Sequence, residues 1–158
     1  MDFRIPFGVR GHKYTEEEIA TTVAVMHGEA PLTQGACLHE FESRFRRYAG
    51  VEHAFAVSSA TAALEIAAQL CQFETDDEVI IPAHTYTSSA YPFVKAGATP
   101  VWADIDPDTR VVTPETISAC ISSRTRAVVV PHLYGYGVDM TPIMALAEER
   151  QIIVIEEA

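Results

Sequence analysis

The chain has 158 residues, a formal net charge of −11 and a pI of about 4.8, and 48% of its residues are hydrophobic. This balance predicts a globular protein of one domain's length and argues against nucleic acid as the main partner. Three widely spaced cysteines without a CxxC or Cys/His pattern, with no signal-peptide core and no long apolar run, predict a cytoplasmic protein without a metal, disulfide or membrane site.

Residues 1–50 are predicted to form an N-terminal helical arm without a strand of its own. Thr15 and Glu18 make the capping box "TEEE", which opens a helix to about His27. A second, amphipathic helix is predicted because apolar residues recur at helical spacing, namely Leu38, Phe41, Phe45 and Tyr48. We expect this arm to pack on another part of the molecule or on a partner subunit.

Residues 51–158 alternate short β-rich runs with longer helical runs. Strands are predicted at 54–57, 78–81, 99–104, 126–131 and 152–156, and helices at 60–72, 86–96, 114–122 and 140–150. Near-continuous apolar strands separated by helices indicate the α/β class, with a mainly parallel sheet flanked by helices on both faces. Ligands of such sheets bind at the carboxyl ends of the strands, so the turns that follow each strand hold the candidate residues.

The first of these turns is "SSATAAL", residues 58–64. The hydroxyls of Ser59 and Thr61, with the backbone N–H groups of Ala60 and Thr61, form a pattern suited to phosphate at a helix start. An ordinary helix cap explains the same residues and is the simpler interpretation of this stretch alone. Neither a GxGxxG nor a GxxxxGK[ST] nucleotide motif is present.

The second turn is "PAHTYTSS", residues 82–89. Tyr86 is placed to stack on a planar ligand, although a tyrosine of the core would give the same sequence. His84 is either a polar site residue or a loop histidine. The aspartates of "DIDPDT", 104–109, resemble a calcium loop only superficially, because its glycine and closing glutamate are absent, and a solvated proline turn is expected.

The last two turns follow the strands predicted at 126–131 and 152–156. In "PHLYGYGVDM" the candidates that face a site are His132, Tyr134 and Tyr136, and Asp139 is expected to cap the next helix. The final strand ends in Glu156 and Glu157, one of which should point to the site side. A carboxylate beside a heteroaromatic nitrogen keeps that nitrogen protonated, and pyridoxal phosphate requires such a partner.

The candidate phosphate-binding turn at 58–64, the candidate stacking residue Tyr86 and the carboxylate at the end of the last strand occur in this order along the chain. They lie within several longer segments that have a recognisable pattern. These segments are "PLTQGACLHEFESRF", "AVSSATAALEIA", "DEVIIPAHTYTSS", "AGATPVWADIDPDT", "TRAVVVPHLYG" and "IIVIEEA". As an ordered set they resemble the DegT/StrS-type (DegT/DnrJ/EryC/StrS) family of pyridoxal-phosphate-dependent sugar aminotransferases. The resemblance implies part of a fold-type I PLP-transferase large domain at 51–158, without its C-terminal part and small domain.

The resemblance also implies site residues by position. The implied cofactor-binding residues are Ser59, Ala60, Thr61, Tyr86 and Glu157. Glu157 stands where the family usually has aspartate, so the acid that pairs with the pyridine nitrogen is one methylene longer here. Thr33 and Gln34 of "PLTQG", together with His84, are implied on the substrate side.

The resemblance places the Schiff-base lysine in a segment beyond the last predicted strand. Neither Lys13 nor Lys95 matches that position, so we expect no catalytic lysine in this chain and no activity from it alone. It is then a fragment of a longer enzyme, one half of a split enzyme, or a remnant with a structural or binding role.

The function implied by the resemblance is amino transfer from glutamate or glutamine to a keto-sugar, usually nucleotide-linked, in amino-sugar biosynthesis. The complete enzyme is implied to be a homodimer, or this chain to pair with a complementing C-terminal half. Two alternatives remain open at this point. One is a pyridoxal-phosphate-dependent sugar dehydratase of the same family, and the other is a catalytically incompetent half that acts as an interaction partner.

Overall fold

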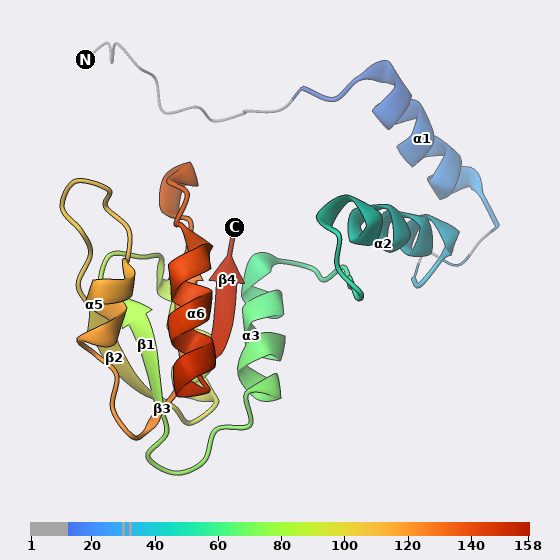
Figure 1. Cartoon of the computed structure of the whole chain (residues 1–158). Helices are drawn as coiled ribbons and strands as arrows, with labels where there is room; N and C mark the ends of the chain where they lie inside the picture. Colours follow the sequence, from blue (N-terminus) through green and yellow to red (C-terminus); the bar gives the residue numbers. More distant parts are fainter. Residues whose placement is uncertain (1–12, 30, 32) are drawn as a thin grey trace, which may run out of the picture. The chain divides into compact units, whose positions relative to one another are not determined.

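The structure is a computed structural model that describes residues 13–29, 31 and 33–158 (Figure 1). The chain divides into two compact units, Met1–Ala56 and Val57–Ala158. Among the described residues, no helix combines the length and the apolar character needed to cross a membrane.

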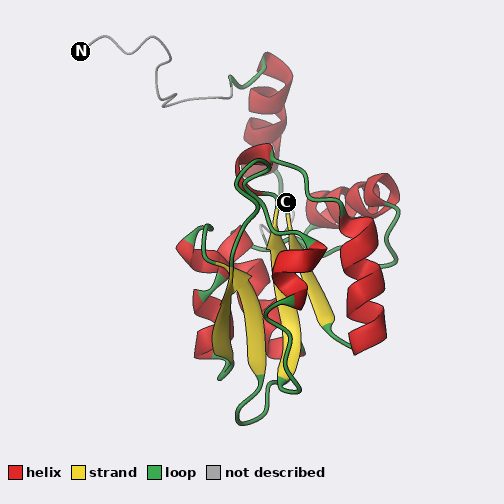
Figure 2. Cartoon of the chain, turned by 60° about the vertical axis from the view of Figure 1, so that its left-hand side comes forward, coloured by secondary structure: helices red, strands yellow, loops and turns green. Residues whose placement is uncertain are grey.

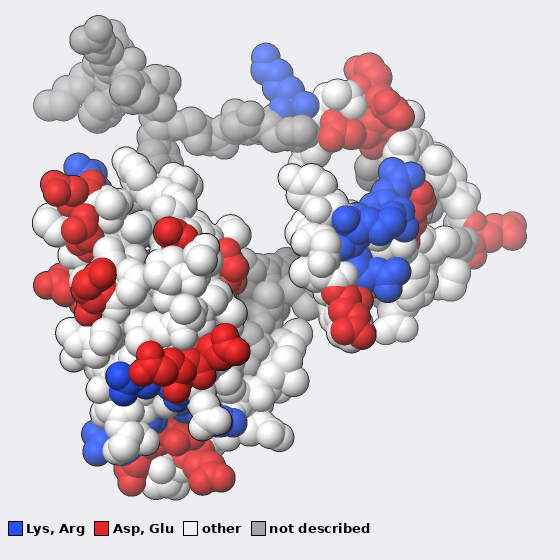
Figure 3. Space-filling model, in the orientation of Figure 1, with Lys and Arg blue, Asp and Glu red and all other residues white. Residues whose placement is uncertain are grey.

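The first unit contains two helices, α1 (Glu16–His27) and α2 (Ala36–Ala49), as the sequence predicts. The capping box at Thr15 is formed: the backbone N–H of Glu18 donates to the Thr15 hydroxyl, and the N–H of Thr15 donates to the Glu18 carboxylate. Neither helix buries a residue, and Phe45 on the apolar side of α2 is 50% exposed. Lys and Arg side chains gather over α2, whose last turn contains Arg46 and Arg47 (Figure 3).

The second unit is a four-stranded parallel sheet with helices on both faces (Figure 2). Its strands are β1 (Glu78–Pro82), β2 (Thr99–Ala103), β3 (Thr125–Pro131) and β4 (Ile153–Glu157), in the spatial order β2-β1-β3-β4. Its helices are α3 (Ala60–Leu70), α4 (Tyr91–Lys95), α5 (Pro114–Ser118) and α6 (Met140–Arg150), with short 3₁₀ turns η1 (Thr87–Ser89) and η2 (Leu133–Gly135).

The strands are buried on both sides because apolar residues occupy successive positions. In β3, Ala127 and Val129 belong to the core under α3 and α4, whereas Val128 and Val130 belong to the core under α5 and α6. From β1 the chain connects to β2 on one side of it in the sheet. The next connection runs in the opposite direction across the sheet, past β1, to β3. Right-handed crossovers put helices on opposite faces when the direction reverses, which explains why α4 and α5 lie on different sides.

Three elements differ from the sequence prediction, one of which is the helix predicted at 114–122, since α5 already ends at Ser118. The strand predicted at 54–57 is wrong: these residues form a loop, because no described strand pairs with them and extended backbone alone makes no ladder. The helix predicted at 86–96 is divided into η1 and α4. Pro92 has no N–H to donate to the carbonyl of Ser88, so a continuous helix would lose a hydrogen bond there.

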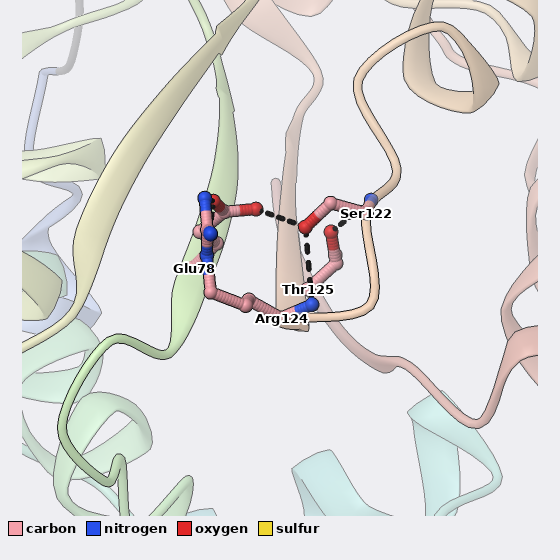
Figure 4. A network of polar contacts seen from close by, with 4 residues as sticks. All are labelled: Glu78, Ser122, Arg124 and Thr125. Carbon is pink, nitrogen blue, oxygen red and sulfur yellow. Dashed lines mark hydrogen bonds and ion pairs between the residues drawn. The ribbon is translucent and has the colours of Figure 1, made fainter.

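A buried acid secures the amino ends of the two central strands. Glu78, the first residue of β1, is 5% exposed. Its carboxylate accepts hydrogen bonds from the Ser122 hydroxyl and the Arg124 guanidinium, and its N–H donates to the Arg124 carbonyl at 2.9 Å (Figure 4). The Ser122 hydroxyl and then Arg124 lower the pKa of Glu78 below its usual value of 4.5. This network ties the start of β1 to the loop that leads into β3.

We expect Glu78→Gln to lower the free energy of unfolding at pH 7 by about 1–3 kcal/mol, because a charge-assisted network becomes a neutral one in a buried position. The folded pKa of Glu78 is depressed, so its contribution is complete above pH 4.5 and is lost as the pH falls through the folded pKa. The difference between wild type and variant should therefore shrink under acid conditions. Urea unfolding followed by the fluorescence of Trp102, which lies in β2, measures it.

Glu148→Gln is the matched control, since Glu148 is exposed on α6. A gap between wild type and Glu78→Gln that stays constant from neutral to acid pH would contradict the assigned role.

Candidate functional site

The topology singles out one place for a ligand. Connections after β1 and β3 leave toward opposite faces of the sheet, so their carboxyl ends diverge, and such switch points are where open α/β sheets bind ligands. Three segments reach this edge: the loop after β1, the loop after β3, and the end of β4. The amino end of α3 lies at the same edge, because α3 runs antiparallel to β1 (Figure 1).

Glu157 is the last residue of β4 and lies opposite Pro131 in the register with β3. Ile153 and Ile155 pack on the core under α3 and α4, so the strand's alternation directs Glu157 to that face. Its Oε2 accepts a hydrogen bond from the Ser89 hydroxyl at 2.6 Å. Its Oε1 has no hydrogen-bond partner among the described residues, and none of their buried side-chain oxygens is unsatisfied. Oε1 is therefore open to a donor from outside.

Ser89 and Thr85 are residues that the sequence analysis did not identify. Ser89 is 1% exposed, and its Oγ accepts a hydrogen bond from the Thr85 hydroxyl at 2.9 Å. Both belong to "HTYTSS", residues 84–89, a run rich in hydroxyl residues after β1. A run of hydroxyl residues at a strand end is the signal that could have marked them, but only the structure brings Ser89 to Glu157.

The start of α3 combines a capping hydroxyl with open amides. Ser59 is the N-cap, and its hydroxyl accepts from the N–H of Ala62 at 3.1 Å. The ordinary cap expected from the sequence is thus formed. The N–H groups of Ala60 and Thr61 have no partner among the described residues, and both residues are exposed. Two open amides at the positive end of an 11-residue helix suit an anion such as phosphate.

Tyr86 is not a core residue. It precedes η1 and is 71% exposed, so its ring is accessible at the edge of the sheet. His84 is also exposed, and its ring lies 6.3 Å from that of Tyr134, centroid to centroid. The loops after β1 and β3 therefore meet through these two rings. Tyr134 has a positive φ of 57°, which turns the chain sharply at η2.

His132 contacts residues on the other face of the sheet, the face that α6 covers. Its Nδ1 accepts from the N–H of Val138 at 2.9 Å, so Nε2 carries the hydrogen and donates to Glu156 Oε1 at 2.7 Å. Glu156 follows Val154 on the α6 side. Adjacent acids thus have different partners: Glu156 bonds to His132, and Glu157 bonds to Ser89. Asp139 caps α6 as expected, accepting from the N–H of Thr141.

Thr33 and Gln34 belong to the first unit, whereas the other candidate residues belong to the second. Both are exposed, and Gln34 has a positive φ of 53°. Asp106 holds a turn by accepting from the N–H groups of Asp108 and Thr109, which accounts for part of the "DIDPDT" run. Within the described ranges no group of three or more metal-ligating side chains comes together.

The chemistry of this edge fits a small phosphorylated heteroaromatic group. The amides of Ala60 and Thr61 suit its phosphate, the exposed ring of Tyr86 offers a stacking surface, and Glu157 Oε1 is open to a protonated ring nitrogen.

Comparison with known proteins shows the family to which this chain belongs. The sequence model of the DegT/DnrJ/EryC1/StrS aminotransferase family matches residues 12–158. The spore coat polysaccharide biosynthesis protein SpsC of Bacillus subtilis is 39% identical over 80% of this chain and 33% of its own length. The GDP-perosamine synthase of Caulobacter vibrioides is 41% identical over 78% of this chain and 33% of its own.

Among solved structures, the aminotransferase from Psychrobacter cryohalolentis is similar with a TM-score of 0.85 and 34% identity, over 96% of this chain and 38% of that one. The chain thus spans about a third of the length of the curated relatives that it matches.

The bond from Val138 to His132 gives a local test. We expect His132→Phe, which keeps a flat ring but removes both nitrogens, to speed hydrogen exchange at the Val138 amide about tenfold, since that N–H loses its acceptor. Amide exchange measured by NMR gives the rate residue by residue. His84→Phe is the control, because the His84 ring makes no hydrogen bond to the described residues. Equal Val138 rates in all three proteins would show that the bond is not formed in solution.

Proposed function

Because this chain belongs to the DegT/DnrJ/EryC1/StrS aminotransferase family, we propose that it is the N-terminal, cofactor-binding part of a pyridoxal-phosphate-dependent sugar aminotransferase. Its curated relatives are a spore coat polysaccharide biosynthesis protein and a GDP-perosamine synthase. A similar putative sugar aminotransferase from Streptococcus pneumoniae has been solved in a PLP form and a PMP form, which supports this cofactor. The observation that carries the proposal is Glu157, whose Oε1 is open at the carboxyl edge of the sheet while Oε2 is held by Ser89.

Each cofactor residue has a distinct role in this proposal. Ser59, Ala60 and Thr61 hold the phosphate at the start of α3. Tyr86 stacks on the pyridine ring, and Glu157 keeps the ring nitrogen protonated by accepting a hydrogen bond from its N–H. When bound, pyridoxal phosphate acts as the electron sink for amino transfer. The role of this chain is to bind and orient the pyridine ring and to keep the proton on the ring nitrogen.

The substrate in this proposal is a keto-sugar, with glutamate or glutamine as the amino donor. The name of the Caulobacter relative, a GDP-perosamine synthase, supports a nucleotide-linked sugar. Thr33, Gln34 and His84 are proposed on the substrate side, and the complete enzyme is proposed to be a homodimer.

Cofactor binding can be tested with pyridoxamine 5′-phosphate, because this form binds without a covalent bond to lysine. We expect saturable binding by calorimetry, and about a two- to tenfold weaker affinity for Tyr86→Ala, which removes an aromatic stacking surface. Tyr91→Ala is the matched control, since Tyr91 is also an exposed tyrosine, 52% exposed, but lies in α4 beside Lys95. An equal affinity for wild type and Tyr86→Ala would remove the stacking role, and no binding by wild type would contradict the cofactor proposal.

Amino transfer can be tested in a chimera in which this chain replaces the matching segment of the Caulobacter GDP-perosamine synthase, about a third of that protein. We expect the chimera to retain bound pyridoxal phosphate and to move the amino group of glutamate or glutamine to a keto-sugar. Mass spectrometry of the sugar product measures the transfer. A chimera that binds the cofactor but transfers no amino group from either donor would contradict the proposed function.

A further inference from the structure

A glutamate at position 157 faces a positioning problem. It has one more rotatable bond than aspartate, so holding its carboxylate in one place costs additional conformational entropy. The residue is only partly buried at the end of β4, and packing alone leaves such an end free to move. An acid that must meet a single ring nitrogen needs a second contact that holds it.

The structure contains that contact on the buried side of the carboxylate. Ser89 is 1% exposed and donates to Glu157 Oε2 at 2.6 Å, across 68 residues of sequence. The other oxygen, Oε1, is left without a partner among the described residues. One oxygen is therefore anchored, and the other has a defined outward position.

Thr85 gives this contact its direction. A serine hydroxyl has one hydrogen and can either donate or accept at a given neighbour. The Thr85 hydroxyl donates to Ser89 Oγ at 2.9 Å, so the Ser89 hydrogen is directed to Glu157. Successive hydroxyl donors of this kind also polarise and strengthen one another.

We propose that Ser89, oriented by Thr85, is the positioning residue that anchors Glu157 Oε2 and presents Oε1 to the ring nitrogen of the cofactor. This inference rests on the proposed function. It explains how a longer acid serves at a position where the family usually has aspartate, because the anchoring bond takes up the additional methylene and removes its rotational freedom.

The experiment separates positioning from simple packing by comparing two ligands. One is pyridoxamine 5′-phosphate, and the other is its 1-deaza analogue, in which C–H replaces the ring nitrogen. The ratio of their dissociation constants isolates the contact between the ring nitrogen and Glu157, since the phosphate and stacking contacts are common to both. Ser88→Ala is the matched control, because Ser88 is the neighbouring serine and makes no hydrogen bond to Glu157 among the described contacts.

We expect wild type and Ser88→Ala to prefer the ligand with the ring nitrogen, and Ser89→Ala to lower that preference about fivefold to tenfold. Thr85→Val keeps the shape of the side chain and should lower the preference about two- to threefold, which also covers the case in which Ser89→Ala fails to fold. In a Glu157→Asp background the acid is one methylene shorter, so we expect its bond to Ser89 to be lost and the Ser89→Ala change to have no further effect.

A second measurement needs no ligand. The side-chain couplings of Glu157 measured by NMR should report one rotamer in wild type and averaged rotamers in Ser89→Ala. A preference for the ring nitrogen that survives both Ser89→Ala and Thr85→Val, or an equal loss of affinity for both ligands, would overturn the inference. If wild type binds neither ligand, the proposed function fails. The couplings then decide the anchoring alone, and averaged rotamers in wild type would overturn it.

Discussion

A hydrogen bond between two residues 68 positions apart, Ser89 and Glu157, is the contact on which the site depends. It forms only if β1, β3 and β4 lie side by side in their observed register, because Ser89 follows β1 and Glu157 ends β4. The network of Glu78 holds the opposite end of β1 to the loop before β3. The central strands are thus secured at their amino ends by a buried acid, and the carboxyl ends gain a defined geometry for chemistry.

Much of the second unit could be read from sequence, because its signals are local. The apolar runs that became β1, β2, β3 and β4, and the cap of α6 at Asp139, depend on neighbouring residues alone. Two features were not local: residues 54–57 have a strand's composition but no described pairing partner, and Ser89 is hydrogen-bonded to an acid in another strand. The division of the helix at Pro92 is a local effect, because the proline lacks the N–H that a continuous helix would use. Sequence patterns report propensity, whereas pairing and contact require the assembled sheet.

The site residues expected from the resemblance fall into two groups. Ser59, Ala60, Thr61, Tyr86 and Glu157 all lie in the second unit, at the start of α3 and at the carboxyl ends of β1 and β4. Thr33 and Gln34 lie in the first unit. The proposed cofactor contacts therefore all belong to one folded body.

The neighbouring acids Glu156 and Glu157 carry a consequence for the accuracy of folding. A strand that slips by one residue exchanges the two faces of every side chain, and here it would exchange two carboxylates of the same kind. Composition alone would not penalise that error. The hydrogen-bond partners of the two acids do penalise it, because His132 lies on one face of the sheet and Ser89 on the other. A β4 slipped by one residue would place a glutamate beside only one of these partners, so the two contacts together favour the observed register of this strand.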